Sequence, residues 1–538
     1  MDTRLEMDCR EAGRINKDNL KKLLKDNRDT SFGKEYGFSE IKSVDEFWKK
    51  VPLQEYGRLK ADIERMFTGE DNVLTAYPVF GYCLSSGTEG ERKHIPLTFE
   101  ALRRYSDHIE RCKKAVFSEN PGKRLFLNGF RIGMQEENRK DKLLSELYYQ
   151  YLFQQGLLSF DDYAGGEEAL FDQFTGEELF YVKAWIGFCT EEVTVLESIF
   201  LYDQLLFFQY IERNWETLLT HMRKGQIPED IFLSEKVSAH LCAMPVNEQR
   251  LCRVEEVCAE GFEAIGKRLW PGLALASGIS NPSFSREEEL LRFYLGEVPV
   301  SYFSYVASEC HMGVAAAPED CSFIMLPQSA FYEYLPYEEE GCEKETLLPG
   351  EVKAGSWYEP VLTTFSGLYR YRLGDVIEVC GFYGESPVIR FLFRKNQRLN
   401  GAGEKMTGWQ IEQAVREMKE KHKMAFSGYC IALLEDSIPV RYGCVFAVAE
   451  EKKTAPEEAA RWIDEAFCRR NVDYSDVREL GFLGAPEVLL VTETAYLLFL
   501  EEAGLMQGHR KPIHTAKVFS KEIWSKWKKR KEQTGWRL

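Results

Sequence analysis

The stretch GYCLSSGTEGERKHIPLT, residues 81–98, gathers side chains that suit a phosphate group. Glycines let backbone N–H groups approach an anion, hydroxyls donate further hydrogen bonds, and a lysine adds positive charge. Serine, threonine and glycine are also ordinary residues of a polar hairpin turn. The stretch alone therefore leaves polyphosphate binding and a simple turn as alternatives. Its hydroxyls, glycines and cations are Ser85, Ser86, Gly87, Thr88, Gly90, Arg92 and Lys93.

Several familiar kinds of site are absent from the sequence. It contains no G-x-x-x-x-G-K-[ST] phosphate loop and no G-x-S-x-G turn of a serine hydrolase. A G-x-G-x-x-G pattern begins at Gly401 but fails at Met406. The 14 cysteines form no C-x-x-C pair and the 8 histidines are dispersed, so neither a zinc site nor a disulfide framework is indicated. The pattern indicates reduced thiols in a cytosolic protein.

Two turns farther along the chain carry a carboxylate at the end of a strand-like run. Ser308 and Glu309 follow YFSYVA, and Mg²⁺ bound to a nucleotide usually takes one or two protein carboxylates. Asp375 stands in a Gly-Asp turn after TTFSGLYRYRL, where Arg370 and Arg372 are predicted to share one face of a strand. A carboxylate there could bind vicinal ribose hydroxyls. Gly-Asp is also common in hairpin turns, so a structural role for this turn stays open.

The first part of the chain has the pattern of a large mixed α/β domain. Residues 134–270 are mainly helical, whereas residues 270–395 alternate short apolar runs with turn signals, as an α/β or barrel core does. We predict that this domain covers residues 1–394.

The remaining residues, 395–538, have the pattern of a small α+β domain. A strand, a polar turn and a helix are followed by the strand-like runs GYCIALLE, YGCVFAVAE and APEVLLVT around the helix PEEAARWIDEAFCRR. A length of about 140 residues is typical of one domain. The tail KEIWSKWKKRKEQTGWRL predicts a solvated terminal helix, with a membrane or nucleic-acid contact as the alternative.

Composition and charge limit the classes of function. The 538 residues are 44% hydrophobic and 29% charged, which is typical of a globular protein. The net charge of −17 argues against a nucleic-acid partner, because neutralising phosphates needs clustered lysine and arginine. The N-terminus is polar and helical in pattern, and the most apolar stretch carries Glu197 and Asp203. We therefore expect no signal peptide, no membrane span and a cytoplasmic monomer.

In their order and spacing, these motifs resemble the adenylate-forming superfamily of acyl-CoA synthetases, peptide-synthetase adenylation domains and luciferases. SSGTEGERK is similar to its [ST]-S-G-[ST]-T-G-x-P-K loop, and YVASE to its Y-G-x-[ST]-E motif. Further segments resemble the Gretchen Hagen family of acyl-acid amido synthetases, best known for conjugating plant hormones to amino acids. These segments are SSGTEGERKHIPLT, IERNWETLLTHMRKGQI, KRLWPGL, YVASECHMG, WYEPVLTTFSGLYRYRLGDVIEVCGF and FRKNQRLN. The similarity runs from about residue 50 to 515, and TTFSGLYRYRLGD is its most specific part.

The resemblance implies a nucleotide site in the large domain. Ser308 and Glu309 would face ATP, with Glu309 on Mg²⁺, and Asp375 would bind the ribose hydroxyls. Five residues would cradle the phosphates: Ser85, Ser86, Gly87, Thr88 and Lys93.

The resemblance also implies residues at the hinge, on the small domain and in the acyl pocket. Arg394 would lie at the hinge, and Lys405 matches a family lysine in the equivalent turn. Lys511 is the first candidate for the C-terminal lysine and Lys517 the second. Ser277 and Gly278, in ALASGIS, would line the acyl and nucleotide pocket. Aromatic residues of the helices predicted at 194–224 are either pocket or core: Phe200, Tyr202, Phe207, Phe208 and Tyr210.

The sequence departs from the family pattern at several positions. Glu89 replaces the usual serine or threonine of the phosphate loop, and Arg92 stands where many superfamily members have proline. A carboxylate about 6 Å from a phosphate oxygen costs about 3 kcal/mol at an effective dielectric constant near 20. Either Glu89 points outward, or the loop binds ATP less well. The segment GHRKPIHTAKVF also differs from the Gln-x-Lys-x-Pro-Arg-like segment of relatives.

The implied reaction has two steps: formation of an acyl-adenylate and pyrophosphate from a carboxylic acid and ATP, then displacement of AMP by an amino acid or other amine. Positioning and charge stabilisation would supply most of the catalysis. Two alternatives stay open. An acyl-CoA ligase shares the first step but transfers the acyl group to a thiol. A non-catalytic relative that binds a nucleotide or a carboxylate would release no pyrophosphate.

Overall fold

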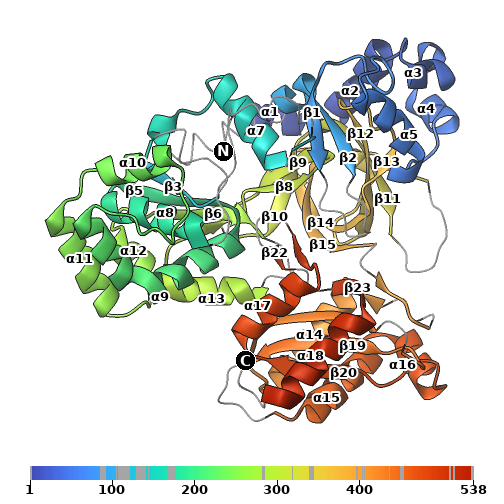
Figure 1. Ribbon diagram of the computed structural model, residues 1–538. Coiled ribbons are helices and arrows are strands. Elements are labelled where there is room, and N and C mark those ends of the chain that lie inside the picture. The colour runs from blue at the N-terminus through green and yellow to red at the C-terminus, as the bar shows by residue number, and fades with distance from the viewer. Residues whose placement is uncertain are drawn as a thin grey trace.

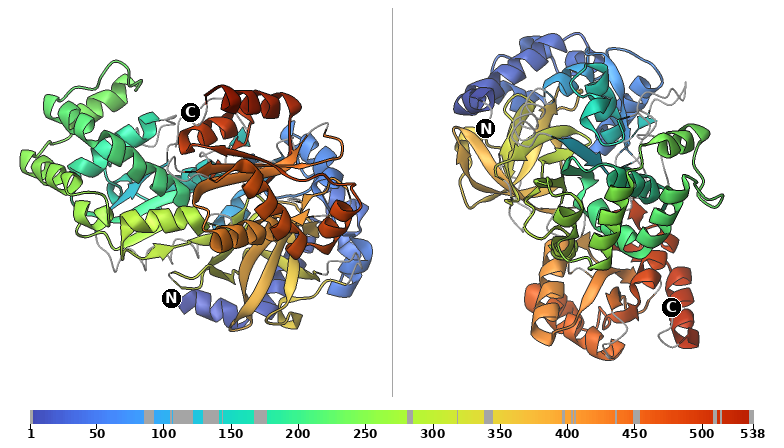
Figure 2. Two further views of the ribbon diagram at one scale, coloured as in Figure 1. Left: turned by 90° about the horizontal axis from the view of Figure 1, so that it is seen from below. Right: turned by 90° about the vertical axis from the view of Figure 1, so that its left-hand side faces the viewer.

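The computed structural model shows a large body built around three sheets and a smaller body at one end (Figures 1 and 2). None of the helices in the described ranges has the length and apolar character of a membrane span. The structure describes residues 3–84, 93–104, 106, 122–128, 141–142, 144–166, 177–280, 285–317, 319–337, 345–395, 398–402, 404, 406–434, 437–448, 454–507, 511–512 and 515–534.

The N-terminal part packs short helices around a small sheet of order β2-β1-β4. Helix α4 begins after Ser43, whose side chain accepts a hydrogen bond from the Glu46 N–H, as a cap residue does. Strands β1 and β2 are antiparallel neighbours and flank residues 85–92. The elements are α1 (Thr3–Arg10), α2 (Ala12–Asp26), α3 (Ser31–Glu35), η1 (Phe38–Glu40), α4 (Val44–Lys50), α5 (Tyr56–Phe67), β1 (Val79–Leu84), β2 (His94–Thr98), β4 (Asp141–Lys142), α7 (Leu144–Gln154) and η2 (Phe160–Asp162).

A parallel sheet of order β3-β5-β6-β7 lies beside this part and packs against helices α8 and α9 (Figure 1). The first six residues of β5 are buried, which is typical of a central parallel strand. Helix α9 ends at Gly225, whose positive φ of 63° suits the residue after a helix. The elements are β3 (Lys123–Phe126), α8 (Glu177–Cys189), β5 (Val193–Phe200), α9 (Leu201–Lys224), α10 (Glu235–Ala243), α11 (Glu248–Ala259), α12 (Ile265–Leu269), β6 (Leu275–Ile279), α13 (Ser285–Leu295) and β7 (Val300–Ser301).

An eight-stranded sheet completes the large body, with the order β11-β12-β14-β15-β10-β9-β8 and β13 paired to β12. Its strand pairs are antiparallel, and most join through short connections. The predicted alternation of apolar runs and turns after residue 270 is confirmed by these strands. They are β8 (Ser304–Ala307), β9 (Cys310–Ala315), β10 (Ser322–Met325), β11 (Ala330–Pro336), β12 (Trp357–Thr364), β13 (Tyr371–Arg372), β14 (Asp375–Tyr383) and β15 (Ser386–Arg394), with η5 (Pro349–Glu351).

The small body is a sheet of order β20-β19-β18-β23 with one apolar core on each face. Both cores consist of residues beyond 398, so the predicted α+β organisation is confirmed. The elements are β16 (Arg398–Leu399), β17 (Met406–Thr407), α14 (Gly408–His422), β18 (Phe426–Leu434), β19 (Tyr442–Val448), α15 (Pro456–Arg470), α16 (Val472–Glu479), β20 (Glu487–Val491), α17 (Glu493–Glu502), β21 (Met506–Gln507), β22 (Lys511–Pro512), β23 (Thr515–Phe519) and α18 (Lys521–Thr534).

Helix α18 confirms the prediction of a helix in the tail but not the prediction that it is solvated. Trp524 and Trp527 are only 6% and 2% exposed and pack against the sheet of the small body. Their indole N–H groups donate to Glu487 and Glu502, and Lys528 pairs with Glu487. The two tryptophans therefore dock the helix, because burying their large side chains outweighs its polar composition.

Candidate functional site

Ser308 and Glu309 form the tight turn between β8 and β9. Strand β8 ends at Ala307 and β9 begins at Cys310, and these two residues are register partners across the turn. The prediction that the Ser-Glu pair stands at a strand end is therefore confirmed. The Oε1 of Glu309 accepts a hydrogen bond from the hydroxyl of Tyr371, in β13 of the same sheet, at 3.1 Å.

Asp375 and Arg394 face each other at the open end of the β14–β15 hairpin, opposite its turn. Asp375 is the first residue of β14 and Arg394 the last of β15, and they are cross-strand partners. The Arg394 Nε donates to Asp375 Oδ1 at 2.7 Å, and the Tyr305 hydroxyl donates to Asp375 Oδ2 at 3.0 Å. The carboxylates of Asp375 and, more weakly, Glu309 raise the pKa of the Arg394 guanidinium. One cation thus lies near both predicted carboxylates, 66 residues apart in sequence.

Tyrosines connect this pair of carboxylates to the strands that flank the predicted phosphate loop. Burial, then the Glu309 carboxylate, raises the pKa of Tyr371, and Tyr56 also contributes. The Lys93 Nζ lies 5.3 Å from the centre of the Tyr56 ring. Near the end of β1, burial and the charge of Glu309 raise the pKa of the Cys83 thiol. The end of β1 therefore lies within electrostatic reach of Glu309, and Lys93, directly before β2, is linked to it through Tyr56 and Tyr371. The predicted phosphate ligands Ser85, Ser86, Gly87 and Thr88 lie outside the described residues.

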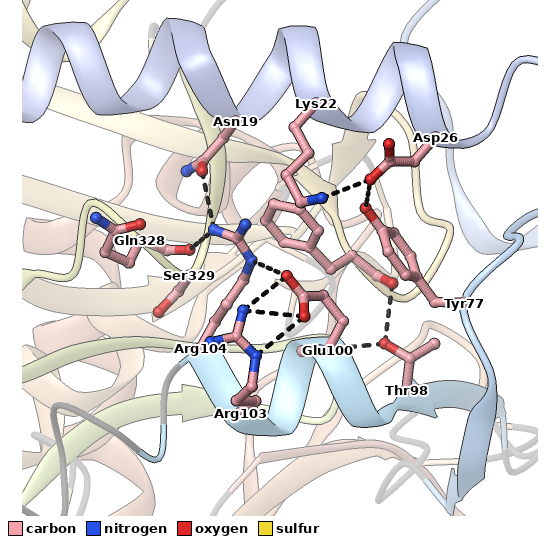
Figure 3. A network of polar contacts seen from close by, with 12 residues as sticks. Asn19, Lys22, Asp26, Tyr77, Thr98, Glu100, Arg103, Arg104, Gln328 and Ser329 are labelled. Carbon is pink, nitrogen blue, oxygen red and sulfur yellow. Dashed lines mark hydrogen bonds and ion pairs between the residues drawn. The ribbon is translucent and has the colours of Figure 1, made fainter.

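A polar network fixes the chain after β2 relative to the loop that precedes Tyr371 (Figure 3). The Thr98 Oγ1 donates to the Phe365 carbonyl at 2.9 Å. The Arg104 guanidinium lies 3.6 Å from the centre of the Phe365 ring, and its NH1 donates to Asn19 Oδ1 and to the Gln328 carbonyl, each at 3.1 Å (Figure 3). Strand β2 and the loop that precedes Tyr371 are thereby tied to helix α2 through Arg104.

Two arginines near Asp375 do not lie as predicted. Arg370 precedes β13 with a positive φ of 44°, so the prediction that it shares a strand face with Arg372 is wrong. Its buried guanidinium pairs with Glu333 at 2.9 Å and also donates to the Val51 carbonyl. Arg372 pairs instead with Glu359 at 2.7 Å. The two side chains therefore serve different buried carboxylates.

The predicted acyl-pocket residues lie on the parallel sheet and its first covering helix. Ser277 and Gly278 are in β6, and Ser277 is the register partner of Ser301 in β7. A Cβ at Gly278 would lie 3.0 Å from both the Leu201 N and the Ser198 Oγ, so a larger residue would disturb the start of α9. Residues 193–200 form a strand, so the prediction of helix there is wrong. Of the five aromatic candidates, Phe207, Phe208 and Tyr210 belong to the core, whereas Phe200 and Tyr202 are partly exposed.

The lysine candidates belong to the small body. Lys405 lies outside the described residues, and Lys511 and Lys517 are described only by their backbone. Lys511 opens β22 and is the register partner of Gln507, and Lys517 lies in β23, which pairs with β18. The choice between them stays a prediction.

The site contains three tyrosines that were not among the predicted site residues. Tyr305 and Tyr371 stand inside the quoted motifs YFSYVASE and LYRYRLGD, so the motifs contained a signal for them. Tyr56 lies far from both motifs in sequence, and only the fold brings it to Tyr371. No group of three His, Cys, Asp or Glu side chains in the described part of the chain could hold a metal ion. A single carboxylate at Glu309 suits Mg²⁺ whose other ligands are phosphate oxygens and water.

Three family models match consecutive parts of the sequence. The GH3 (Gretchen Hagen) family N-terminal domain matches residues 2–300, the GH3 family central domain residues 323–394, and the GH3 family C-terminal domain residues 409–515. The first match alone covers more than half of the chain. The second match ends at Arg394, the last residue of β15.

Known proteins of similar sequence and structure agree with these matches. The indole-3-acetic acid-amido synthetase GH3.3 of Arabidopsis thaliana is 27% identical over 426 residues, which are 74% of this chain and 70% of that protein. The solved structure of the AtGH3.15 acyl acid amido synthetase with 2,4-DB superposes with a TM-score of 0.82 at 23% identity, covering 98% of this chain and 95% of that one. A 2-hydroxyisobutyryl-CoA ligase with its acyl-AMP has a TM-score of 0.51 at 10% identity, covering 98% and 91%. The fold is therefore that of adenylate-forming enzymes.

Proposed function

The chain belongs to the GH3 family, and we propose that it is an acyl acid amido synthetase that activates a carboxylic acid with ATP and joins it to an amino acid. The observation that carries this proposal is that Asp375 pairs with Arg394, while the Glu309 carboxylate, bonded to Tyr371, lies close enough to raise the pKa of the same guanidinium. The two carboxylates have the separate tasks that a bound nucleotide requires, one near the phosphates and one at the ribose.

ATP would lie across the turns that end β8 and begin β14. Asp375 would accept hydrogen bonds from the ribose hydroxyls through lone pairs not engaged by Arg394 and Tyr305. Lys93 and the loop residues 85–88 would hold the phosphates. Glu309 would ligate Mg²⁺, which neutralises part of the charge on the leaving pyrophosphate when it is bound. Arg394 stays cationic throughout, since its pKa is raised.

In the first step, a substrate carboxylate oxygen bonds to the α-phosphorus, the bond to the β-phosphate oxygen breaks, and pyrophosphate leaves. In the second, the amine nitrogen bonds to the acyl carbon, the bond to the AMP oxygen breaks, and the nitrogen loses a proton. The residues named here position these groups and stabilise charge. Ser277 and Gly278 would border the acyl group.

The small body, residues 395–538, would present its lysines to this site and move between the two steps. Lys511, Lys517 or Lys405 would approach the nucleotide for adenylation and then withdraw. Such a movement concentrates in the few residues that connect two bodies, each with its own core. We place this connection directly after β15.

The alternative acceptor is the thiol of coenzyme A. It is favoured by the fold shared with 2-hydroxyisobutyryl-CoA ligase, whereas the match to all three GH3 domains favours an amine. The same acyl-adenylate serves both acceptors, so only the second step separates them.

Pyrophosphate release from ATP and Mg²⁺ with a panel of carboxylic acids tests the first step. We expect release with one class of acid and faster turnover when amino acids, rather than coenzyme A, are added. Glu309→Gln should slow adenylation by about 100-fold or more, because a charge at the reacting phosphates is lost. Glu378→Gln is a matched control, since its carboxylate pairs with Arg390 at 3.5 Å on the same sheet. Equal release by the wild type and Glu309→Gln, or none by folded wild-type protein, would contradict the proposal.

A further inference from the structure

Glu359 is a buried carboxylate that bonds to the residue directly before β14 and to the residue directly after β15. It lies on β12 and is 1% exposed. Its Oε2 receives the Arg372 NH2 at 2.7 Å and the Lys395 Nζ at 2.7 Å. Its Oε1 receives the Gly374 N–H at 3.2 Å. One carboxylate thus holds two cations and one backbone donor, which is the arrangement that a buried charge requires.

Two partners of Glu359 are the sequence neighbours of Asp375, which is proposed to bind the ribose, and of its ion-pair partner Arg394. Gly374 directly precedes Asp375, and Lys395 directly follows Arg394. Lys395 is held a second time, because its backbone N–H donates to the Gly374 carbonyl at 2.7 Å. Its Nζ also lies 5.2 Å from the centre of the Tyr337 ring. The turn at Asp375 and the end of β15 are therefore fixed to one another through a residue that is remote in sequence.

Lys395, the first residue assigned to the small body above, is therefore held by the large body. Its side chain and its backbone are both bonded to residues of the large body, so a rotation that began at Arg394 or Lys395 would break a charge-assisted hydrogen bond. Rotation about bonds after Lys395 breaks neither contact.

We propose that Glu359 is a positioning residue that holds the Asp375–Arg394 pair in the geometry that binds the ribose. Because Glu359 also anchors Lys395, the hinge begins after Lys395. This inference rests on the proposed function, since it assigns the ribose to Asp375. Glu359 itself does not touch the nucleotide; it acts through Gly374 and Lys395. When the charge of Glu359 is lost, Asp375 stays at the start of β14, but the turn at Gly374 that orients its side chain is no longer held.

The test compares ATP with 2′-deoxy-ATP in the full-length protein, because discrimination between them reports the contact between Asp375 and the ribose. Calorimetric titration gives both affinities without turnover, and pyrophosphate release gives both KM values. We expect Glu359→Gln to weaken ATP binding about tenfold or more and 2′-deoxy-ATP binding much less, so that the discrimination ratio falls. Glu378→Gln, on the same sheet, should leave the ratio unchanged.

Lys395→Met provides a second variant on a partly exposed side chain, in case Glu359→Gln folds poorly. It should also lower the ratio, and the double variant should be no worse than Glu359→Gln alone, because both act through one contact. A ratio that stays at the wild-type value in Glu359→Gln and Lys395→Met overturns the inference. If the wild-type protein binds ATP but releases no pyrophosphate, the proposed function is contradicted instead. The ratio of the ATP and 2′-deoxy-ATP affinities then still tests the positioning role of Glu359. Wild-type protein that binds neither nucleotide overturns both.

Discussion

Glu333 and Glu359 of the large body and Glu404 of the small body are buried carboxylates that are stabilised in different ways. In the large body, Glu333 pairs with Arg370 at 2.9 Å, and Glu359 holds Arg372 and Lys395. In the small body, the fully buried Glu404 has neutral partners. Its Oε1 accepts from the Gly401 N–H at 2.7 Å and the Tyr442 hydroxyl at 2.8 Å, and its Oε2 accepts from the Ala402 N–H at 2.7 Å.

This difference reflects what each carboxylate connects. Glu333 and Arg370 are 37 residues apart, and Glu359 and Lys395 are 36 apart, so cations join distant segments of the large body. Glu404 bonds to two N–H groups of its own loop, two and three positions before it, and to a segment 38 residues away only through the neutral hydroxyl of Tyr442. Cations therefore join distant segments of the large body, whereas two of the three donors to Glu404 belong to its own loop.

The largest expected effect is that of Arg370→Met, which leaves Glu333 buried without its cation. Removing one partner of a buried ion pair destabilises a protein by about 3–5 kcal/mol. Burial already raises the pKa of Glu333 and Arg370 opposes that rise, so the variant raises it further. A carboxyl group whose pKa is higher when folded favours the folded state when protonated, and this contribution is lost as pH rises through the folded pKa. The deficit in unfolding free energy should therefore be larger at pH 8 than at pH 5.5 in urea titrations.

The double variant Arg370→Met with Glu333→Gln is the control for that charge. It should lose the pH dependence of the single variant, because no titrating group remains at the pair. A deficit in Arg370→Met that is equal at both pH values would show that Glu333 is not the cause.

The position of Arg370 also shows where sequence patterns stop being informative. The run GLYRYRLGD predicts a strand with arginines on one face, but the pairing with Glu333 holds Arg370 in a left-handed conformation before the strand. Glu333 stands in the apolar run AFYEYLP, where nothing in the local pattern marks it as a partner. Long-range pairing of this kind overrides local periodicity.

The candidate site was predictable where chemistry and strand ends coincide. The sequence marks Glu309 and Asp375 as candidates because each carboxylate follows an apolar run. In the structure, Glu309 lies in the turn after β8, and Asp375 begins β14. The sequence does not mark Tyr56, since it opens a helix more than 300 residues before Tyr371, and only the fold brings the two together. The tail helix shows the same limit, because a strongly basic sequence gives no indication of the sheet that its tryptophans cover.

An intermediate effect is expected for Tyr442→Phe, which removes one neutral donor from Glu404. A hydrogen bond to a charged acceptor contributes about 1.5–3 kcal/mol, and the two backbone donors remain. We expect a loss of about 1.5 kcal/mol, with faster amide exchange at Gly401 and Ala402, measured by hydrogen exchange. Exchange at these amides that equals the wild type, with stability lowered all the same, would mean that Tyr442 acts through packing.

The smallest effect is expected where a cation and a carboxylate meet across the two bodies at the surface. Lys419 of α14 lies 3.3 Å from Glu289 of α13, with side chains 31% and 70% exposed. Exposed pairs contribute about 0–1 kcal/mol and weaken with salt, so Lys419→Met should change unfolding free energy by less than about 0.5 kcal/mol at 0.15 M salt. Urea titrations at low and physiological salt measure this. A loss above about 1 kcal/mol at both would mean that this surface pair helps to hold the two bodies together. A small loss leaves the small body free to turn beyond Lys395 at little energetic cost.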